Sequence, residues 1–305
     1  MMPQRDKERQ MDMQKYLQRI NYDGPIDNQA TTLYELCACH YSHVPFENLD
    51  IFGGPRRSMN LDEIYSRVVN KMRGGLCCEG NALFAWLLRK LNFKVEFIQT
   101  KLYNKKTDSY DGDLEHMVLL VTCKNDEKFV ANISGCSFVR PLALIDMKTQ
   151  VQRCGAYRLR KETDDVYLIE KMQKKVFNLS GREITGFSSD EDGWQVIQKL
   201  EIISRCWLDF KPTFLHIVDK KQSFLSRNTL CTIENDCGIR VLWGMTFYKK
   251  EYIDHCTEKV VSVQTAQDEE ELKSILKNHF NISIDYNLKP CSPDLKKEEL
   301  VRMSL

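Results

Sequence analysis

The pattern of apolar and polar residues along the 305-residue chain changes twice. Up to about residue 93, apolar side chains recur at helical spacing, as at residues 31–44 and 60–72, and Asn60 is placed to cap the second of these helices. Between residues 93 and 172, short apolar runs alternate with polar turns, which predicts β-strands. The expected strands are KVEFIQTKLY, HMVLLVTC, KFVANI, AYRLR and DVYLIEKM.

The last third of the chain has a mixed pattern. A polar segment rich in Gly and Ser at residues 178–194 predicts a surface loop, residues 229–250 predict a hairpin, and residues 268–280 predict an amphipathic helix. We therefore expect an α+β fold of three units. These are helical residues 1–92, a β unit at residues 93–215 and a mixed α/β unit at residues 216–305.

Composition and charge favour an ordinary globular protein. The chain is 42% hydrophobic and 29% charged with a formal net charge of +1, so no basic excess favours nucleic acid or an anionic membrane as a partner. The charged first residues show no secretory signal, and no apolar stretch approaches the roughly 20 residues that span a bilayer. We expect a cytoplasmic location, and we interpret most of the twelve cysteines as small buried thiols.

The segment RGGLCCEGN at residues 73–81 carries the first candidate chemistry. Its glycine pair allows a tight turn, and the apolar run that follows predicts a buried helix beginning near Cys77. A cysteine at a helix N-terminus faces unpaired N–H groups and the positive end of the helix dipole, which both favour the thiolate. Cys77 comes first after the turn, so we predict that it is the nucleophile and that Cys78 packs behind it.

A thiol nucleophile needs a base, and the base needs a third group to orient it. His116 differs from the other five histidines because it opens an apolar strand straight after a long polar loop. If residues 124–126 form a three-residue hairpin loop, Cys123 faces Glu127 and His116 faces residue 134. Asn132 is then on the same face as that partner, because strand side chains alternate. The predicted constellation is Cys77, His116 and Asn132.

A zinc site is the other chemistry that histidines and cysteines suggest. CACHYSH at residues 37–43 places two cysteines and two histidines close together. Structural zinc sites need a second ligand pair at a defined spacing, and no matching pair occurs. We therefore expect no metal.

At this point the chain resembles a known family. VPFENLDI at residues 44–51, RGGLCCEGN at 73–81 and EHMVLLV at 115–121 match the arylamine N-acetyltransferases in sequence, order and separation. Three later segments match as well, and the resemblance covers nearly the whole chain, being weakest at about residues 180–225. These segments are VRPLALI, VLWGMTFYKKEY and LKNHFNISIDYNLKP.

The resemblance implies a fold, a reaction and a cytoplasmic role in xenobiotic metabolism. The fold would be a helical bundle, a β-barrel and a C-terminal α/β lid around a cysteine-protease-like Cys-His core. Acetyl-coenzyme A would acetylate Cys77, with His116 as the base, and an arylamine or hydrazine would then take the acetyl group in a ping-pong reaction. We expect a monomer. Family position implies an acceptor pocket lined by Phe46, Leu102, Ile133, Gly135 and Cys136.

Several polar residues have supporting roles in this interpretation. Arg73, Glu47 and Asn48 are expected to form an ion pair and hydrogen bonds that hold the turn bearing Cys77, with Asn81 supporting the same site. No phosphate-binding glycine loop occurs, so the pair Lys105 and Lys106 is the candidate for contacting the coenzyme A phosphates.

Asn132 stands where the family has an aspartate. An asparagine can hold the imidazole tautomer through its amide oxygen, but it carries no charge to stabilise the imidazolium. Cysteine hydrolases also use Cys-His-Asn, so the arrangement is not chemically disabling. Two alternatives therefore stay open beside the transferase: a thiol hydrolase with the same three residues, and a catalytically weak or inactive paralogue.

Overall fold

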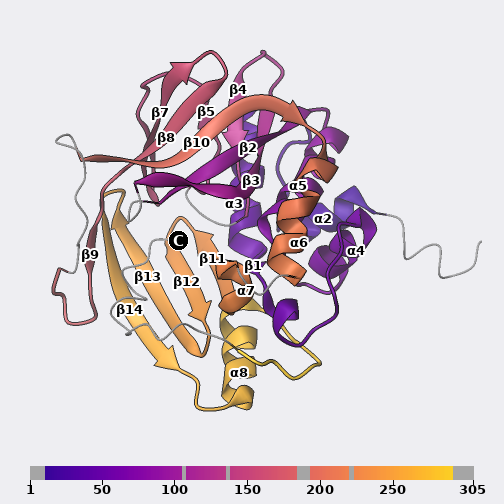
Figure 1. Ribbon diagram of the computed structural model, residues 1–305, viewed down its shortest axis with the longest axis vertical. Helices are drawn as coiled ribbons and strands as arrows, with labels where there is room; N and C mark the ends of the chain where they lie inside the picture. Colours follow the sequence, from indigo (N-terminus) through magenta and orange to yellow (C-terminus); the bar gives the residue numbers. More distant parts are fainter. Residues whose placement is uncertain (1–10, 105–107, 135–137, 184–192, 220–222, 291–305) are drawn as a thin grey trace, which may run out of the picture.

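The computed structural model describes residues 11–104, 108–134, 138–183, 193–219 and 223–290. Within them the chain forms a cluster of helices, an eight-stranded sheet and a six-stranded sheet (Figure 1). The helices are α2 Met13–Arg19, α3 Ala30–His43, η1 Leu49–Phe52, α4 Leu61–Tyr65, η2 Ser66–Asn70, α5 Cys77–Lys90, η3 Trp207–Phe210, α6 Lys211–Asp219, α7 Phe224–Arg227 and α8 Glu269–Phe280.

The N-terminal helices begin and end where the local sequence directs. The Asn60 side chain accepts from the backbone N–H groups of Asp62 and Glu63, which confirms it as the cap of α4. Helix α5 buries its apolar residues, among them Leu83 and Leu87, against β2 and β3. This packing fixes the start of α5 beside the large sheet.

The eight-stranded sheet has the order β5-β4-β3-β2-β10-β8-β7-β6 and is nearly closed into a barrel. Its two edge strands, β5 and β6, approach each other and are joined by side-chain hydrogen bonds. The Gln150 side chain donates to Ala143 O at 2.9 Å and accepts from Ala143 N at 2.7 Å. The strands are β2 Lys94–Asn104, β3 Ser109–Thr122, β4 Lys128–Ala131, β5 Leu142–Ala143, β6 Gln150–Gln152, β7 Gly155–Thr163, β8 Val166–Met172 and β10 Trp194–Arg205.

The hairpin of β3 and β4 has the predicted register. Thr122 pairs with Lys128, Cys123 N donates to Glu127 O at 2.9 Å, and the turn is the expected residues 124–126. Another expectation was wrong. His116 does not open a strand, because β3 begins at Ser109, and the polar residues Ser109, Tyr110 and Glu115 pair with β2 on either side of a register shift.

Strand β10 was not predicted, although it lies between β2 and β8 in the sheet. Its pairing with β8 shifts register between Val196 and Gln198. Such a bulge breaks the two-residue alternation by which a half-buried strand is recognised in a sequence. The gap in the sequence pattern therefore has a local structural cause.

The six-stranded sheet draws on three distant parts of the chain and has the order β1-β11-β12-β13-β14-β9. Strand β1 from the helical region pairs with β11, and β9 from the barrel region pairs in parallel with β14. The boundaries expected at residues 92 and 215 stay a prediction. The strands are β1 Phe46–Glu47, β9 Lys175–Phe177, β11 Leu230–Asn235, β12 Gly238–Trp243, β13 Thr246–Asp254 and β14 Thr257–Thr265.

Among the described residues, no helix is both long enough and apolar enough to span a membrane. The described cysteines are free thiols.

Candidate active site

Cys77 is the first residue of α5, as predicted, and it is nearly buried. The preceding turn is tightly enclosed. A Cβ at Gly74 would lie 1.8 Å from Pro45 O, so only glycine fits there, and Leu76 N donates to the Glu79 carboxylate at 2.8 Å. Close backbone packing therefore requires a glycine at position 74. The turn places Cys77 at the N-terminus of the helix, where the helix dipole is positive.

The two adjacent thiols have opposite properties. A hydrogen bond from Cys78 is the largest influence on Cys77, and it holds the pKa of Cys77 well below its ordinary value. Burial opposes this shift, whereas His116 and the backbone N–H of Cys78 reinforce it. The pKa of Cys78 is raised well above its ordinary value by the same hydrogen bond and by burial. The two directions favour ionisation of Cys77 and keep the proton on Cys78.

His116 lies on β3, is nearly buried, and hydrogen-bonds the Cys77 side chain. Burial is the largest single influence and lowers its pKa, but the charge of Cys77 and the hydrogen bonds to Cys77 and Asn132 together outweigh it, so the net pKa of His116 is raised. Each group therefore stabilises the charged form of the other. Both shifts favour a thiolate on Cys77 and an imidazolium on His116.

Asn132 completes the group from the loop after β4, and its side chain also helps to raise the pKa of His116. Its Oδ1 already accepts from Asn81 Nδ2 at 3.0 Å and from Ser134 N at 3.4 Å. Asn81 Nδ2 additionally donates to Met117 O at 3.0 Å, next to His116. Asn81 thus ties α5, β3 and the Asn132 loop together.

One ring nitrogen of His116, Nε2, has no hydrogen-bond partner of good geometry within the described part of the chain. The Oδ1 of Asn132 is shared with two other donors, and an amide has no second acceptor oxygen to offer. The asparagine therefore orients the imidazole less strongly than a carboxylate would.

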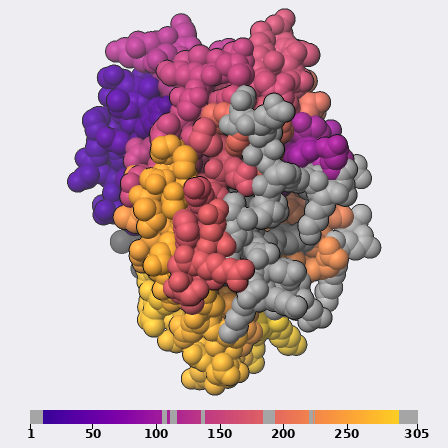
Figure 2. Space-filling model, turned by 90° about the vertical axis from the view of Figure 1, so that its left-hand side faces the viewer, coloured from indigo at the N-terminus to yellow at the C-terminus, as the bar shows by residue number. Residues whose placement is uncertain are grey.

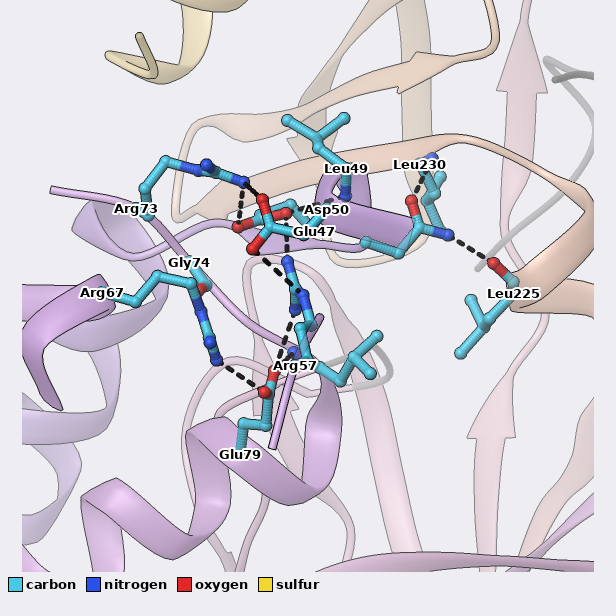
Figure 3. Close-up of polar contacts among 12 residues, drawn as sticks. Glu47, Leu49, Asp50, Arg57, Arg67, Arg73, Gly74, Glu79, Leu225 and Leu230 are labelled. Carbon is cyan, nitrogen blue, oxygen red and sulfur yellow. Dashed lines mark hydrogen bonds and ion pairs between the residues drawn. The ribbon is translucent and has the colours of Figure 1, made fainter. Parts of the chain in front are cut away.

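A buried network of three carboxylates and three guanidinium groups surrounds the turn that bears Cys77 (Figure 3). Arg57 joins Glu47 at 2.6 Å to Glu79 at 2.9 Å, and Arg73 joins Glu47 at 3.0 Å to Asp50 at 2.7 Å. Burial works to raise the pKa of Glu47, but Arg57 and Arg73 outweigh it and lower that pKa. The six members are Glu47, Asp50, Arg57, Arg67, Arg73 and Glu79.

The same region holds the C-terminal part of the chain in place. Asn48 Nδ2 donates to Leu225 O at 2.6 Å, and its Oδ1 accepts from Leu230 N at 2.8 Å (Figure 3). Asn48 Nδ2 also donates to Asn228 O at 2.7 Å. Tyr286 donates to Asp50 at 2.8 Å. These contacts attach the six-stranded sheet to the turn that carries the nucleophile.

The residues predicted to line the acceptor pocket differ in how deeply they are buried. Phe46 is buried on β1 and bridges to Gly75, one residue before the cap of α5. Ile133 is buried beside Asn132, whereas Leu102 is more than a third exposed at 37%. Gly135 and Cys136 lie outside the described residues, as do Lys105 and Lys106.

Sequence reasoning missed Arg57, Asp50 and Tyr286 as partners of the site. Tyr286 lies 236 residues from Asp50 in the sequence, so no local spacing could relate the two. Arg57 follows a second arginine, and the pattern does not distinguish the buried one from its exposed neighbour Arg56. The only signal was the concentration of charged residues around PFENLD and RGGLCCEGN.

Comparisons with known proteins match most of the chain to N-acetyltransferases. A protein-family model described as N-acetyltransferase matches residues 30–289. The pineal gland arylamine N-acetyltransferase isozyme NAT-3 of Gallus gallus is 30% identical over 285 residues, which are 92% of this chain and 97% of that protein. Arylamine N-acetyltransferase 1 of Homo sapiens is 26% identical over 283 residues, which are 92% and 97% of the two chains.

Solved structures share the fold. The Mycobacterium smegmatis arylamine N-acetyltransferase superposes with a TM-score of 0.74 at 21% identity, covering 90% of this chain and 93% of that one. The Mycobacterium marinum enzyme in complex with CoA superposes with a TM-score of 0.72 at 20% identity, covering 89% and 93%. The matches in sequence and in fold cover the helices, the barrel and the C-terminal sheet together, and the chain therefore belongs to the arylamine N-acetyltransferase family of acyltransferases.

Proposed function

We propose that the protein transfers an acetyl group from acetyl-coenzyme A to an arylamine or hydrazine through an acetyl-Cys77 intermediate. The observation that carries this proposal is that Cys77 starts α5 beside Cys78 and His116, whose hydrogen bonds lower the pKa of Cys77 and so favour its thiolate. A thiolate at a helix start is a nucleophile that can attack a thioester without prior deprotonation.

The reaction proceeds in two half-reactions. The Cys77 sulfur attacks the acetyl carbonyl, the thioester bond to coenzyme A breaks, and the departing coenzyme A thiolate takes the proton of the His116 imidazolium. The neutral imidazole then accepts a proton from the amine as its nitrogen attacks the acetyl-cysteine. The Cys77 thiolate leaves, and the starting ion pair is restored. The backbone N–H groups at the start of α5 are the proposed donors to the oxyanion.

Asn132 and the buried network support this chemistry without taking part in bond making. Asn132 orients His116, and Asn81 orients Asn132 through the hydrogen bond between their side chains. Arg73, Glu47 and Asn48 hold the turn on which Cys77 sits. Phe46 and Ile133 are the described residues proposed to line the acceptor pocket, and the role of Leu102 there remains a prediction.

Intact-mass spectrometry tests the first half-reaction. After brief mixing with acetyl-coenzyme A, the protein should gain the mass of one acetyl group, and peptide mapping should place that group on Cys77. Cys77→Ser should remain unmodified, whereas Cys78→Ser should still be acetylated because serine also supplies a hydroxyl donor. A wild-type protein that stays unmodified would refute the proposal and favour the inactive paralogue. Acetylation on Cys78 would refute the assignment of Cys77 as the nucleophile.

The second candidate function is thiol hydrolysis, which the asparagine in the third position favours. Both functions form the same acetyl-enzyme, so the acceptor separates them. Release of coenzyme A should be slow with acetyl-coenzyme A alone and should accelerate severalfold when an arylamine or a hydrazine is added. If the rate is the same with and without the amine, water is the acceptor and the protein is a hydrolase.

We further propose that the protein is a monomer, that it is cytoplasmic and that its reaction needs no metal. Sedimentation of the full chain should give a single species at the monomer mass of 35.7 kDa. Acetylation of Cys77 should be unaffected by a metal chelator, because every proton transfer in the scheme uses His116.

A further inference from the structure

The turn between β13 and β14 brings together several metal-binding side chains that acetyl transfer does not use. Asp254 ends β13, and His255 and Cys256 form the turn. One carboxylate oxygen, one imidazole nitrogen and the thiol sulfur all lie within 4.8 Å of one another. Asp254 is exposed, whereas His255 and Cys256 are half-buried.

A second sulfur lies beside this turn. The Cys256 thiol donates to the Met172 thioether, with the two sulfur atoms 3.7 Å apart. Two sulfur ligands that each lie about 2.3 Å from a tetrahedral metal are separated by about 3.8 Å. The two sulfurs therefore already have the spacing that a shared metal requires.

Backbone hydrogen bonds hold the two sulfur-bearing segments together. Lys175 N donates to Cys256 O at 2.7 Å, and Lys175 pairs with Thr257 where β9 joins β14. Cys256 N donates to the Asp254 carboxylate at 2.7 Å, which shapes the turn. Met172 is the last residue of β8 and pairs with Trp194 of β10. The cluster is thus built on the sheets, and the sulfur spacing follows from their pairing.

The cluster lies on a face of the molecule away from α5. Figure 1 places β9 and β14 on its left-hand side, opposite the helices. Figure 2 looks onto that side and shows the segment around β9 (red) against the last strands (orange to yellow). A metal bound there would not occupy the Cys77 site.

The charged and polar groups beside the turn have partners of their own. Lys174 is engaged with Glu258 of β14 at 3.3 Å. The Cys256 thiol donates its proton to the Met172 thioether.

We propose that Met172, His255 and Cys256 form a binding site for a soft metal ion, copper(I), with the Asp254 carboxylate as the adjacent anionic group. Thiolate and thioether ligands select copper(I), and imidazole also binds it. On binding, the Cys256 S–H bond breaks, a sulfur–copper bond forms, and the proton passes to solvent. Copper stays in the same oxidation state, so no oxidant or reductant is needed. The site is independent of the proposed acetyl transfer.

An anaerobic competition titration tests the site. The reduced protein would be titrated with copper(I) held by bicinchoninate, and the copper withdrawn from the dye would be measured for the wild type and its variants. The wild type should bind one more tight equivalent than Cys256→Ser. Outer-shell partners at metal sites already contribute about 10- to 100-fold in affinity, so Met172→Leu and His255→Gln should weaken this equivalent by at least that factor.

Two controls separate this site from other thiols. Cys237 is an exposed cysteine in the turn between β11 and β12, so Cys237→Ser should retain the equivalent that Cys256→Ser loses. Cys77→Ser should retain it as well. Thermal melting of each variant shows that it is folded, and Met172→Leu conserves side-chain volume.

Three outcomes would overturn the proposal. Equal copper uptake by the wild type and Cys256→Ser would show that no site exists at this turn. Wild-type affinity in folded Met172→Leu would show that the thioether is not a ligand. Binding of zinc(II) in place of copper(I), with the same dependence on Cys256, would overturn the assignment to a soft monovalent ion.

Discussion

The two halves of the candidate active site are held in place by different means. The turn bearing Cys77 is fixed by charge, because a buried network of three carboxylates and three guanidinium groups surrounds it. His116 is fixed by strand register on β3, and Asn132 follows from the hairpin that β3 makes with β4. Apart from Cys77, the groups near His116 that align it are the neutral amides Asn81 and Asn132.

The difference shows which half tolerates change. A buried charge that loses its partner destabilises the protein strongly, so the nucleophile side cannot lose one member alone. An amide that replaces a carboxylate on the base side leaves the register and the packing intact. Asn132, where the resemblance implies an aspartate, lies on this more tolerant base side.

The largest expected effect is the loss of stability caused by Arg57→Met on the nucleophile side of the site. It leaves Glu47 and Glu79 buried without their shared partner, and should lower the free energy of unfolding by about 3–5 kcal/mol. Urea denaturation measures the change. The matched control is Arg56→Met, whose ion pair with Asp219 is exposed and should contribute at most about 1 kcal/mol. Equal losses in the two variants would contradict the proposed role of the network.

Gly74→Ala tests the geometry of the turn directly. The new Cβ would meet Pro45 O at 1.8 Å, so the backbone must move and the unfolding free energy should fall by about 1–3 kcal/mol. Acetylation of Cys77 should slow in the same variant, because α5 starts three residues later. Gly75→Ala is the milder control, since its nearest contact is the end of the Glu79 side chain at 3.1 Å. Chemical denaturation and rapid-quench mass spectrometry give the two measurements.

Cys78→Ala tests the polarity of the thiol pair. It removes the donor that contributes most to the low pKa of Cys77, so that pKa should rise by roughly one to two units, as expected for a hydrogen bond to a charged group. The pH profile of inactivation by iodoacetamide should then move to higher pH. Cys78→Ser keeps a hydroxyl donor and should shift the profile less. Coincident profiles for the wild type and Cys78→Ala would mean that Cys78 does not act on the nucleophile.

The smallest expected effect is on the base side, in Asn132→Asp. A carboxylate stabilises the imidazolium, which in turn favours the thiolate, so the apparent pKa of Cys77 should fall by on the order of one unit. Inactivation by iodoacetamide should therefore begin at lower pH than in the wild type. Its unfolding midpoint in urea should change little, because the packing is unchanged. An unaltered inactivation profile would place Asn132 outside the functional group.

Local sequence predicted much of this site because short-range rules control those parts. The apolar run after RGGLCCEGN placed the start of α5 at Cys77, and the turn at residues 124–126 set the register between β3 and β4. Both follow from side-chain periodicity and turn length, which a chain carries in its nearest neighbours.

Other features followed no local rule. The extension of β3 back to Ser109 comes from pairing with β2 across polar residues, and β10 was hidden by a bulge that shifts its alternation. Tertiary contacts override weak local patterns of this kind, because a strand gains its hydrogen bonds from a partner that the sequence does not identify.

The sequence by itself determined the change from helices to strands near residue 93, the position of Cys77 at a helix start and the register that places Asn132 near His116. The tertiary structure decided how Cys78 and His116 shift the pKa of Cys77, which arginine is buried beside Glu47, and that Tyr286 reaches Asp50. The physical reason is the distance along the chain over which each effect acts. Periodicity, capping and turn length act over a few residues, whereas the charge state of a buried group depends on every neighbour that folding brings to it, however distant in the chain.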